Sequence, residues 1–232
     1  MKSRKWLIIL LAIIVTMMSL ATYTGVTRSV FIDDELSTDD AISMWMNTKY
    51  YLHNNPTPPT GDTNSQAVLP LGPIFVAPTA TTLYDYDQDR DGNAGLFILK
   101  GGTGPGETDP AKHQVWRTGS LSSSEYLVGS VTIDIWGAIT GFTQGKAGEV
   151  FIYLRDYNPS SYSEIGNGNV NEANWQGGSS TWVMKTISIS VLNYTIPAGN
   201  ELEVEVIVGG NSGDDMWFAY DTTSYSSVVE IP

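Results

Sequence analysis

Hydrophobic and polar residues alternate along several stretches of this chain. The alternation is regular over residues 130–135, 150–155, 186–191 and 201–206. A period of two residues turns one set of side chains toward a buried face and the other toward water, which is typical of antiparallel strands. These four stretches therefore predict strands that each have one buried face and one solvent-exposed face.

Shorter apolar runs stand between clusters of Gly, Pro, Asn and Ser. They cover residues 69–76, 96–99, 114–118, 216–221 and 228–231. No helical periodicity reaches 12 residues, so the sequence predicts about nine strands and an all-β fold. The architecture expected for residues 67–232 is a two-sheet antiparallel β-sandwich of jelly-roll type.

The N-terminus has the pattern of an export signal. Lys2, Arg4 and Lys5 precede an uncharged, largely apolar run over residues 6–27. Such a run is a signal peptide or a membrane anchor, and it predicts a signal or anchor helix within residues 1–30. Positive charge before the run keeps the N-terminus inside, so the rest of the chain is expected to be extracellular or at the cell surface.

Residues 31–66 are expected to form an N-terminal arm and a linker. The segment 53–66 is rich in Pro, Thr and Asn and has almost nothing to bury, which is typical of an exposed linker. Residues 33–52 could form one short helix with Ser37 or Thr38 as its N-cap, or an extended arm that docks elsewhere.

Composition and charge narrow the partners. The chain has 12 Lys and Arg against 25 Asp and Glu, for a net charge of −13. Nucleic acids and anionic membranes are recognised by Lys and Arg clusters, so neither is an expected partner, and the membrane enters only through residues 6–27 if they are not cleaved. The absence of cysteine excludes disulfides, thiolate metal sites and a cysteine nucleophile.

Two parts of the chain resemble known families. Residues 29–42, SVFIDDELSTDDAI, resemble the segment that follows the hydrophobic run in exported matrix proteins of the camelysin/TasA type. That resemblance implies a dedicated signal peptidase and a surface or biofilm-matrix destination. The body resembles uncharacterised secreted bacterial and archaeal β-sandwich modules, through residues 84–87, 89, 91, 95–96, 100–102, 116–117, 153–156, 195–199 and 216–222.

An acidic loop is the candidate metal site. Its ligands would be Asp85, Asp87, Asp89, Asp91 and Asn93. Alternate carboxylates place hard oxygen ligands around one point, as calcium requires, so a structural Ca²⁺ is the cofactor that this loop predicts. Position twelve, counted from Asp87, is Ile98 where an EF-hand has Glu, so the loop is not an EF-hand. The alternative is a solvated acidic loop whose aspartates cap turns.

Four aromatic side chains are candidate ligand-binding residues. Trp136, Phe151 and Tyr153 lie on the faces of their strands that are predicted to be exposed to solvent. Trp175 falls in an expected loop. Exposed flat rings stack on sugars or anchor a protein partner. The alternative is that loops or the N-terminal arm cover these rings.

The remaining motifs indicate no catalysis. Only two histidines are present, and His113 lacks the surroundings of a nucleophile elbow. The glycine-rich segment 101–106 lacks the Lys-Ser/Thr ending of a phosphate loop and is expected to be a flexible loop. Glu201, Glu203 and Glu205 are expected to form a solvated strand face, and Asn193 begins the only glycosylation sequon.

Together these observations predict a protein that is not an enzyme. The expected function is a non-catalytic extracellular surface or matrix protein that self-assembles through its N-terminal arm. The alternative is a carbohydrate-binding β-sandwich module stabilised by calcium. The expected partners are further copies of the chain, other surface proteins or a polysaccharide.

Overall fold

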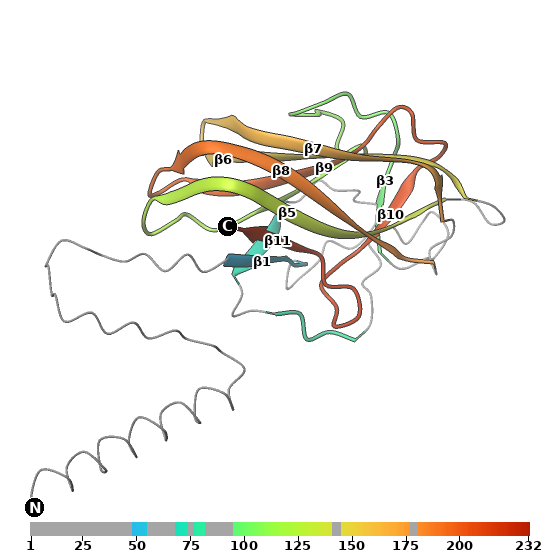
Figure 1. The fold of residues 1–232 in the computed structure, drawn as a ribbon, viewed down its shortest axis with the longest axis horizontal. Coiled ribbons are helices and arrows are strands. Elements are labelled where there is room, and N and C mark those ends of the chain that lie inside the picture. The colour runs from blue at the N-terminus through green and yellow to red at the C-terminus, as the bar shows by residue number, and fades with distance from the viewer. Residues whose placement is uncertain (1–47, 55–67, 74–76, 82–94, 141–144, 177–180) are drawn as a thin grey trace, which may run out of the picture. The chain divides into compact units, whose positions relative to one another are not determined.

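A computed structural model describes residues 48–54, 68–73, 77–81, 95–140, 145–176 and 181–232. The secondary structure of these residues is all-β, which confirms the predicted class (Figure 1). The strands are β1 (Thr48–Leu52), β2 (Leu69–Pro73), β3 (Leu96–Ile98), β4 (His113–Arg117), β5 (Glu125–Ile139), β6 (Lys146–Asn158), β7 (Ser161–Trp175), β8 (Val183–Ile196), β9 (Glu201–Val208), β10 (Met216–Ala219) and β11 (Val228–Ile231).

The strands pair in one continuous order. That order is β3-β10-β5-β11-β1-β2-β4-β9-β6-β7, with β8 on the other edge of β5. The pairing of β2 with β4 is parallel, and the other strand pairs are antiparallel. The long strands β6, β7, β8 and β9 run lengthwise, and the short β3 and β10 lie together toward one end (Figure 1).

One apolar core joins both halves of this strand order. Ile133 of β5 and Ile189 of β8 belong to the same buried cluster as Ile152 of β6 and Val204 of β9. These residues occupy the apolar phase of the four alternating stretches, so the period-two pattern identified the buried faces correctly. The polar residues that alternate with them are predicted to face water. Glu203 and Glu205 on β9 are instead buried.

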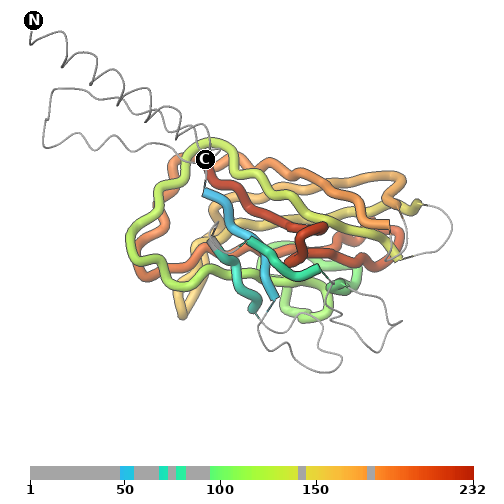
Figure 2. The backbone as a smooth tube through the Cα atoms, turned by 90° about the horizontal axis from the view of Figure 1, so that it is seen from below, coloured from blue at the N-terminus to red at the C-terminus, as the bar shows by residue number. Residues whose placement is uncertain are grey.

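Strand β1 lies within the stretch expected to be an arm. It pairs with β11 on one side and with β2 on the other, and Figure 2 shows it beside the C-terminal strand. The compact unit that contains the sheet spans Trp45–Pro232, so the β-rich part begins well before residue 67. A helix cannot extend through residue 52, because the last residues of that stretch are extended.

Strand β7 was not predicted from the sequence. Its residues are SYSEIGNGNVNEANW, which show no apolar alternation, and most of the strand is exposed. It forms because β6 supplies a long antiparallel partner through a tight turn at Asn158–Ser161. At Gly168 a Cβ would lie 2.7 Å from the side chain of Ile187, so the glycine permits a close approach to β8.

Several predictions concern residues outside the described part of the chain. These are the signal or anchor region 1–30, residues 31–47 of the arm, residues 55–66 of the linker and the acidic loop with Asp85, Asp87, Asp89, Asp91 and Asn93. Among the described residues, no helix is long and apolar enough to cross a membrane. Within the same ranges, no group of three or more His, Cys, Asp or Glu side chains is placed to hold a metal ion.

Candidate functional site

Two buried glutamates occupy the middle of the sheet. Glu203 and Glu205 lie on β9, which is flanked by β4 and β6 rather than lying at an edge. Glu205 is completely buried, and Glu203 is nearly so. The prediction that the acidic ladder is a solvated strand face is therefore wrong for these two residues.

Cross-strand register explains how the glutamates are buried. Arg117 of β4 and Arg155 of β6 stand opposite Glu203 on its two sides. Residues directly opposite on one sheet face are close enough for charged side chains to pair. Each carboxylate therefore finds a guanidinium next to it, which offsets the cost of removing both charges from water.

Arg155 connects the two glutamates. Its Nε lies 2.5 Å from a Glu203 oxygen, and its second contact, from a terminal guanidinium nitrogen to Glu205 Oε2, is 2.9 Å. The Nε–H does not point along the first contact, so that contact is an ion pair rather than a hydrogen bond. Arg117 donates from its Nε to Glu203 over 2.8 Å. Glu203 is thus shared by two arginines, and Arg155 is shared by two glutamates.

Aromatic rings cover the two guanidinium groups. The Arg117 guanidinium carbon lies 3.3 Å from the ring centre of Tyr157, and that of Arg155 lies 4.4 Å from the ring centre of Tyr162. A guanidinium over an aromatic face gains cation–π attraction while its edge still donates hydrogen bonds. The rings shield the ion pairs from water and fix the planes of both arginines.

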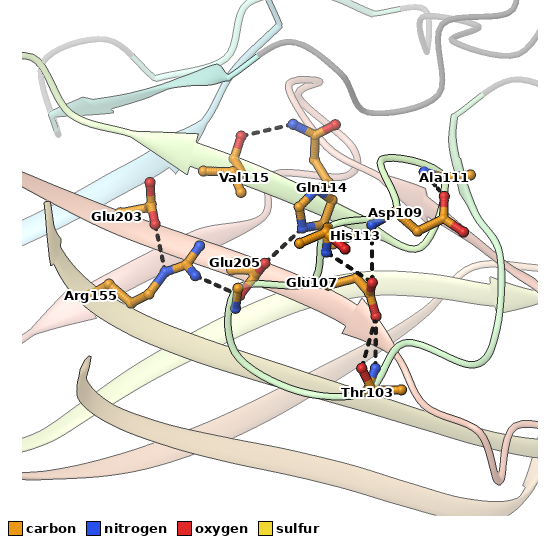
Figure 3. Close-up of polar contacts among 12 residues, drawn as sticks. Thr103, Glu107, Asp109, Ala111, His113, Gln114, Val115, Arg155, Glu203 and Glu205 are labelled. Atoms are coloured by element: carbon orange, nitrogen blue, oxygen red, sulfur yellow. Dashed lines mark hydrogen bonds and ion pairs between the residues drawn. The ribbon is translucent and has the colours of Figure 1, made fainter. Parts of the chain in front are cut away.

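His113 is held by the completely buried glutamate. Its Nδ1 lies 2.7 Å from Glu205 Oε1 (Figure 3). His113 begins β4 two residues before Val115, which stands opposite Glu205, so the imidazole lies on the same face as the carboxylate. With the carboxylate at Nδ1, the neutral ring carries its proton there, and Nε2 is the nitrogen with a lone pair for a reactant.

A loop packs against the cluster and lines an open cavity. Glu205 Oε2 accepts a hydrogen bond of 3.0 Å from the backbone N–H of Gly106. Residues 103–108 line this open cavity of about 290 Å³, and neither His113 nor Glu205 is among its lining residues. One carboxylate therefore binds an imidazole, a guanidinium and the loop that lines the cavity. This volume is just below the range of about 300–1,000 Å³ that is typical of small-molecule sites.

Glu107 holds the loop in shape. Its carboxylate accepts backbone hydrogen bonds from Asp109, Thr103 and Thr108 at 2.9 to 3.0 Å (Figure 3). The bond from Asp109, followed by those from Thr103 and Thr108, outweighs the effect of burial and lowers the pKa of Glu107 from its ordinary value. An ionised carboxylate thus stands in the wall of the cavity, and the segment expected to be only a flexible loop has a defined anchor.

The four predicted aromatic ligand-binding residues do not form a set of exposed rings. Trp175 is 1% exposed and donates from Nε1 to the Gly137 carbonyl over 3.0 Å, so the expected exposed ring is a core residue. Trp136 is half-buried and lies edge-on to Tyr225 at 5.4 Å. Phe151 is half-buried and Tyr153 is buried. Burial, with the nearby Glu164 and Glu205, raises the pKa of Tyr153, so its phenol is neutral beside the ion cluster.

The second histidine also contacts a carboxylate. His53 Nδ1 lies 2.6 Å from Asp221 Oδ1, and Asp221 Oδ2 accepts from the Asn54 backbone N–H over 2.8 Å. His53 Nε2 is buried and has no hydrogen-bond partner. A Cβ added to Gly72 would lie only 2.8 Å from that nitrogen, so β2 packs directly against it.

Comparisons with known proteins place the fold. No family model matches the chain, and no curated protein matches it. Among solved structures, it is similar to an aminopeptidase from the marine sediment archaeon Thaumarchaeota archaeon, at 11% identity and a TM-score of 0.53 over 79% of this chain. It is also similar to an α-amino acid ester hydrolase (11%, TM-score 0.54, 79%) and to a CocE/NonD family hydrolase from Staphylococcus aureus (9%, TM-score 0.52, 80%). The chain spans 36% of the length of each of these structures.

These matches correct two predictions. The sequence predicts a non-catalytic surface or matrix protein, with a carbohydrate-binding module as the alternative, and it predicts that the chain is not an enzyme. The solved structures named above share the fold and are hydrolases, and this finding contradicts both predictions. At this level of identity the likeness concerns the fold, so the chemistry must be argued from this chain's own residues.

Sequence reasoning missed the cluster around Glu205. No local pattern pairs His113 with a carboxylate, and the alternation of the glutamates with apolar residues predicts that they face solvent. The available signal was a pair of arginines on two other predicted strands. Arg155 alternates with apolar residues in the stretch 150–155, and Arg117 lies in the stretch 114–118. Three glutamates on one strand with a basic residue on each neighbouring strand would have indicated a buried polar layer.

Proposed function

We propose that this chain is a β-domain that takes part in hydrolysis of ester or amide bonds, with His113 and Glu205 as its acid–base pair. The observation that carries the proposal is the 2.7 Å contact between His113 Nδ1 and the buried Glu205, next to the loop that lines the cavity. A carboxylate behind an imidazole is the arrangement that lets histidine act as a general base and then as a general acid. The bond class is taken from the names of the hydrolases that share the fold.

The proposed reaction uses water as the nucleophile. In this proposal, His113 Nε2 removes a proton from a water molecule bound next to the imidazole, and the water oxygen attacks the carbonyl carbon of the substrate. The bond between the carbonyl carbon and the leaving oxygen or nitrogen then breaks, and the imidazolium returns the proton to the leaving alcohol or amine. Glu205 keeps the ring oriented and stabilises its positive charge, and Arg155 keeps Glu205 in place without forming a bond to the substrate.

The size of the cavity limits the substrate. The open cavity of about 290 Å³ is smaller than most small-molecule sites, so the proposed substrate is a small ester rather than a polypeptide. A small activated ester is therefore the appropriate first probe. The chain spans about a third of the hydrolases that share its fold, so a partner chain or further domain is part of this proposal for larger substrates.

The test is an assay of p-nitrophenyl acetate hydrolysis by the full chain and by two matched variants. The wild-type chain is expected to accelerate the reaction over buffer, and His113→Gln is expected to lose about 10²-fold or more of kcat/KM, the range of a general base. His53→Gln is the control, since it removes the other carboxylate-bound imidazole. A wild-type rate equal to that of buffer, or equal rates for wild type and His113→Gln, would contradict the proposal.

We also propose that the strand order folds into a two-sheet sandwich of jelly-roll type. The support is that strands from both halves of the order contribute to one buried cluster. Export is proposed on the sequence alone, from the basic residues and the apolar run within residues 1–30. Calcium binding by the acidic loop stays a prediction.

A further inference from the structure

Strand β8 carries a bulge near its C-terminal end. Leu127 of β5 pairs with Tyr194, and Gly129 pairs with Val191, so one residue on β5 faces two on β8. The two residues on β8 are Leu192 and Asn193, and they stand opposite the single Val128 on β5. Asn193 has φ of 47°, in the left-handed region that Asn tolerates better than most residues. Bulges of this kind re-aim side chains, and families retain them as functional features.

The bulge turns the acceptor side chain outward. Leu192 is 90% exposed, and both Asn193 and Thr195 are exposed. Tyr194, between them, turns inward, and its hydroxyl donates to Asp156 Oδ2 over 2.9 Å. The inward Tyr194 anchors the segment, while its two neighbours project to solvent.

We propose that Asn193 is an N-glycosylation site. Asn193-Tyr194-Thr195 satisfies the Asn-X-Ser/Thr requirement with X other than Pro, and the sequence contains no second such triplet. The Asn-Pro-Ser triplet at residues 158–160 is excluded by its proline. The predicted export would bring the chain into contact with a membrane transferase.

The transfer needs one co-reactant, a lipid-linked oligosaccharide. The amide nitrogen Nδ2 of Asn193 attacks the anomeric carbon of the first sugar. The bond between that carbon and the lipid phosphate oxygen breaks, the lipid phosphate leaves, and Nδ2 gives up a proton to a base of the transferase. No oxidant or reductant is consumed.

The surface around Asn193 suits a bound sugar. Tyr126 stands opposite Thr195 in the strand register and is 51% exposed. Tyr126 and the exposed Leu192 each offer apolar surface near the bulge, and the apolar face of a sugar ring can pack against such a surface. Within the described strands β8 pairs only with β5, so a glycan on the bulge extends past the sheet edge without displacing a neighbouring strand.

The test is peptide mapping by mass spectrometry of the full chain purified from the cells that produce it. We expect the peptide containing Asn193 to carry a hexose- or hexosamine-type mass increment. Asn193→Gln and Thr195→Val should both lose it, and Thr195→Ser should keep it. Thr195→Val and Thr195→Ser differ in whether the hydroxyl is present, so they separate sequon recognition from strand packing.

Asn169→Gln is the matched control, because it changes an exposed asparagine on β7 outside any sequon and should leave the increment unchanged. An unmodified wild-type peptide would overturn the proposal. An increment that persists in Thr195→Val would also overturn it, since the modification would then be independent of the sequon. Neither result bears on the hydrolysis proposed for His113.

Discussion

The two histidines of this chain stand in similar contacts but in different surroundings. His113 Nδ1 is 2.7 Å from Glu205, and His53 Nδ1 is 2.6 Å from Asp221. Glu205 also binds Arg155 and the backbone of a loop that lines a cavity, whereas the Nε2 of His53 is buried against β2 without a partner. The two carboxylate–imidazole contacts thus differ in their surroundings: Glu205 also binds a guanidinium and a loop, and the second nitrogen of His53 is enclosed by β2. This difference is the reason that the proposed acid–base role is assigned to His113 and not to His53.

The largest expected effect comes from removing the guanidinium behind Glu205. Arg155→Met should lower the free energy of unfolding by about 3–5 kcal/mol, because it leaves Glu203 and Glu205 buried with too little compensating charge. Lys49→Met is the control, since it breaks the exposed ion pair with Glu230 and should cost about 1 kcal/mol or less. Urea denaturation of both variants measures the difference, and equal costs would mean that the cluster is not buried as described.

A smaller effect tests the closed surroundings of His53. Gly72→Ala would place a Cβ 2.6 Å from the His53 ring and 2.8 Å from its Nε2, which should destabilise the fold by about 1–3 kcal/mol through overpacking. Gly119→Ala is the matched control, because nothing lies within 4 Å of its added Cβ. Thermal melts of the two variants should therefore differ clearly, and two unchanged melting temperatures would show that space exists beside His53.

The smallest effect concerns the loop over His113 and depends on pH. Because folding lowers the pKa of Glu107 below its ordinary 4.5, its charge stabilises the folded loop fully above that value, and this stabilisation is lost as the pH falls through the lowered pKa. Glu107→Gln should cost about 0.5 to 1 kcal/mol near pH 7, as for a surface capping side chain. The difference from wild type should vanish in acid.

Denaturation at several pH values measures this dependence, with Glu125→Gln as a control that removes a strand carboxylate instead. A cost of Glu107→Gln that stays constant from neutral pH into acid would show that the charge of Glu107 does not hold the loop.

The sequence predicted the strands better than it predicted the site. Alternation identified β5, β6, β8 and β9 because burial of one face leaves a period-two signal. It missed β7, whose polar residues pair through the backbone and bury little. It also assigned Glu203 and Glu205 to water, since a local pattern cannot reveal the arginines that the strand order brings alongside from 86 and 48 residues away.

The aromatic residues show the same limit. Trp175 was expected in an exposed loop because its neighbours are Asn, Gln and Gly, yet β7 extends to it and its indole donates into the core. His113 could be identified as one of two histidines, but not as the one with a buried carboxylate behind it. That distinction depends on contacts across the sheet, which no local window contains.

The most direct test of the proposed acid–base pair is a double-mutant cycle on kcat/KM for p-nitrophenyl acetate hydrolysis, using His113→Gln, Glu205→Gln and the double variant. Circular dichroism establishes that each variant is folded at the assay temperature. If Glu205 acts through His113, the double variant loses no more activity than His113→Gln alone, because residues that work as a unit are not additive. Losses that multiply, or activity that survives in His113→Gln, would contradict the account.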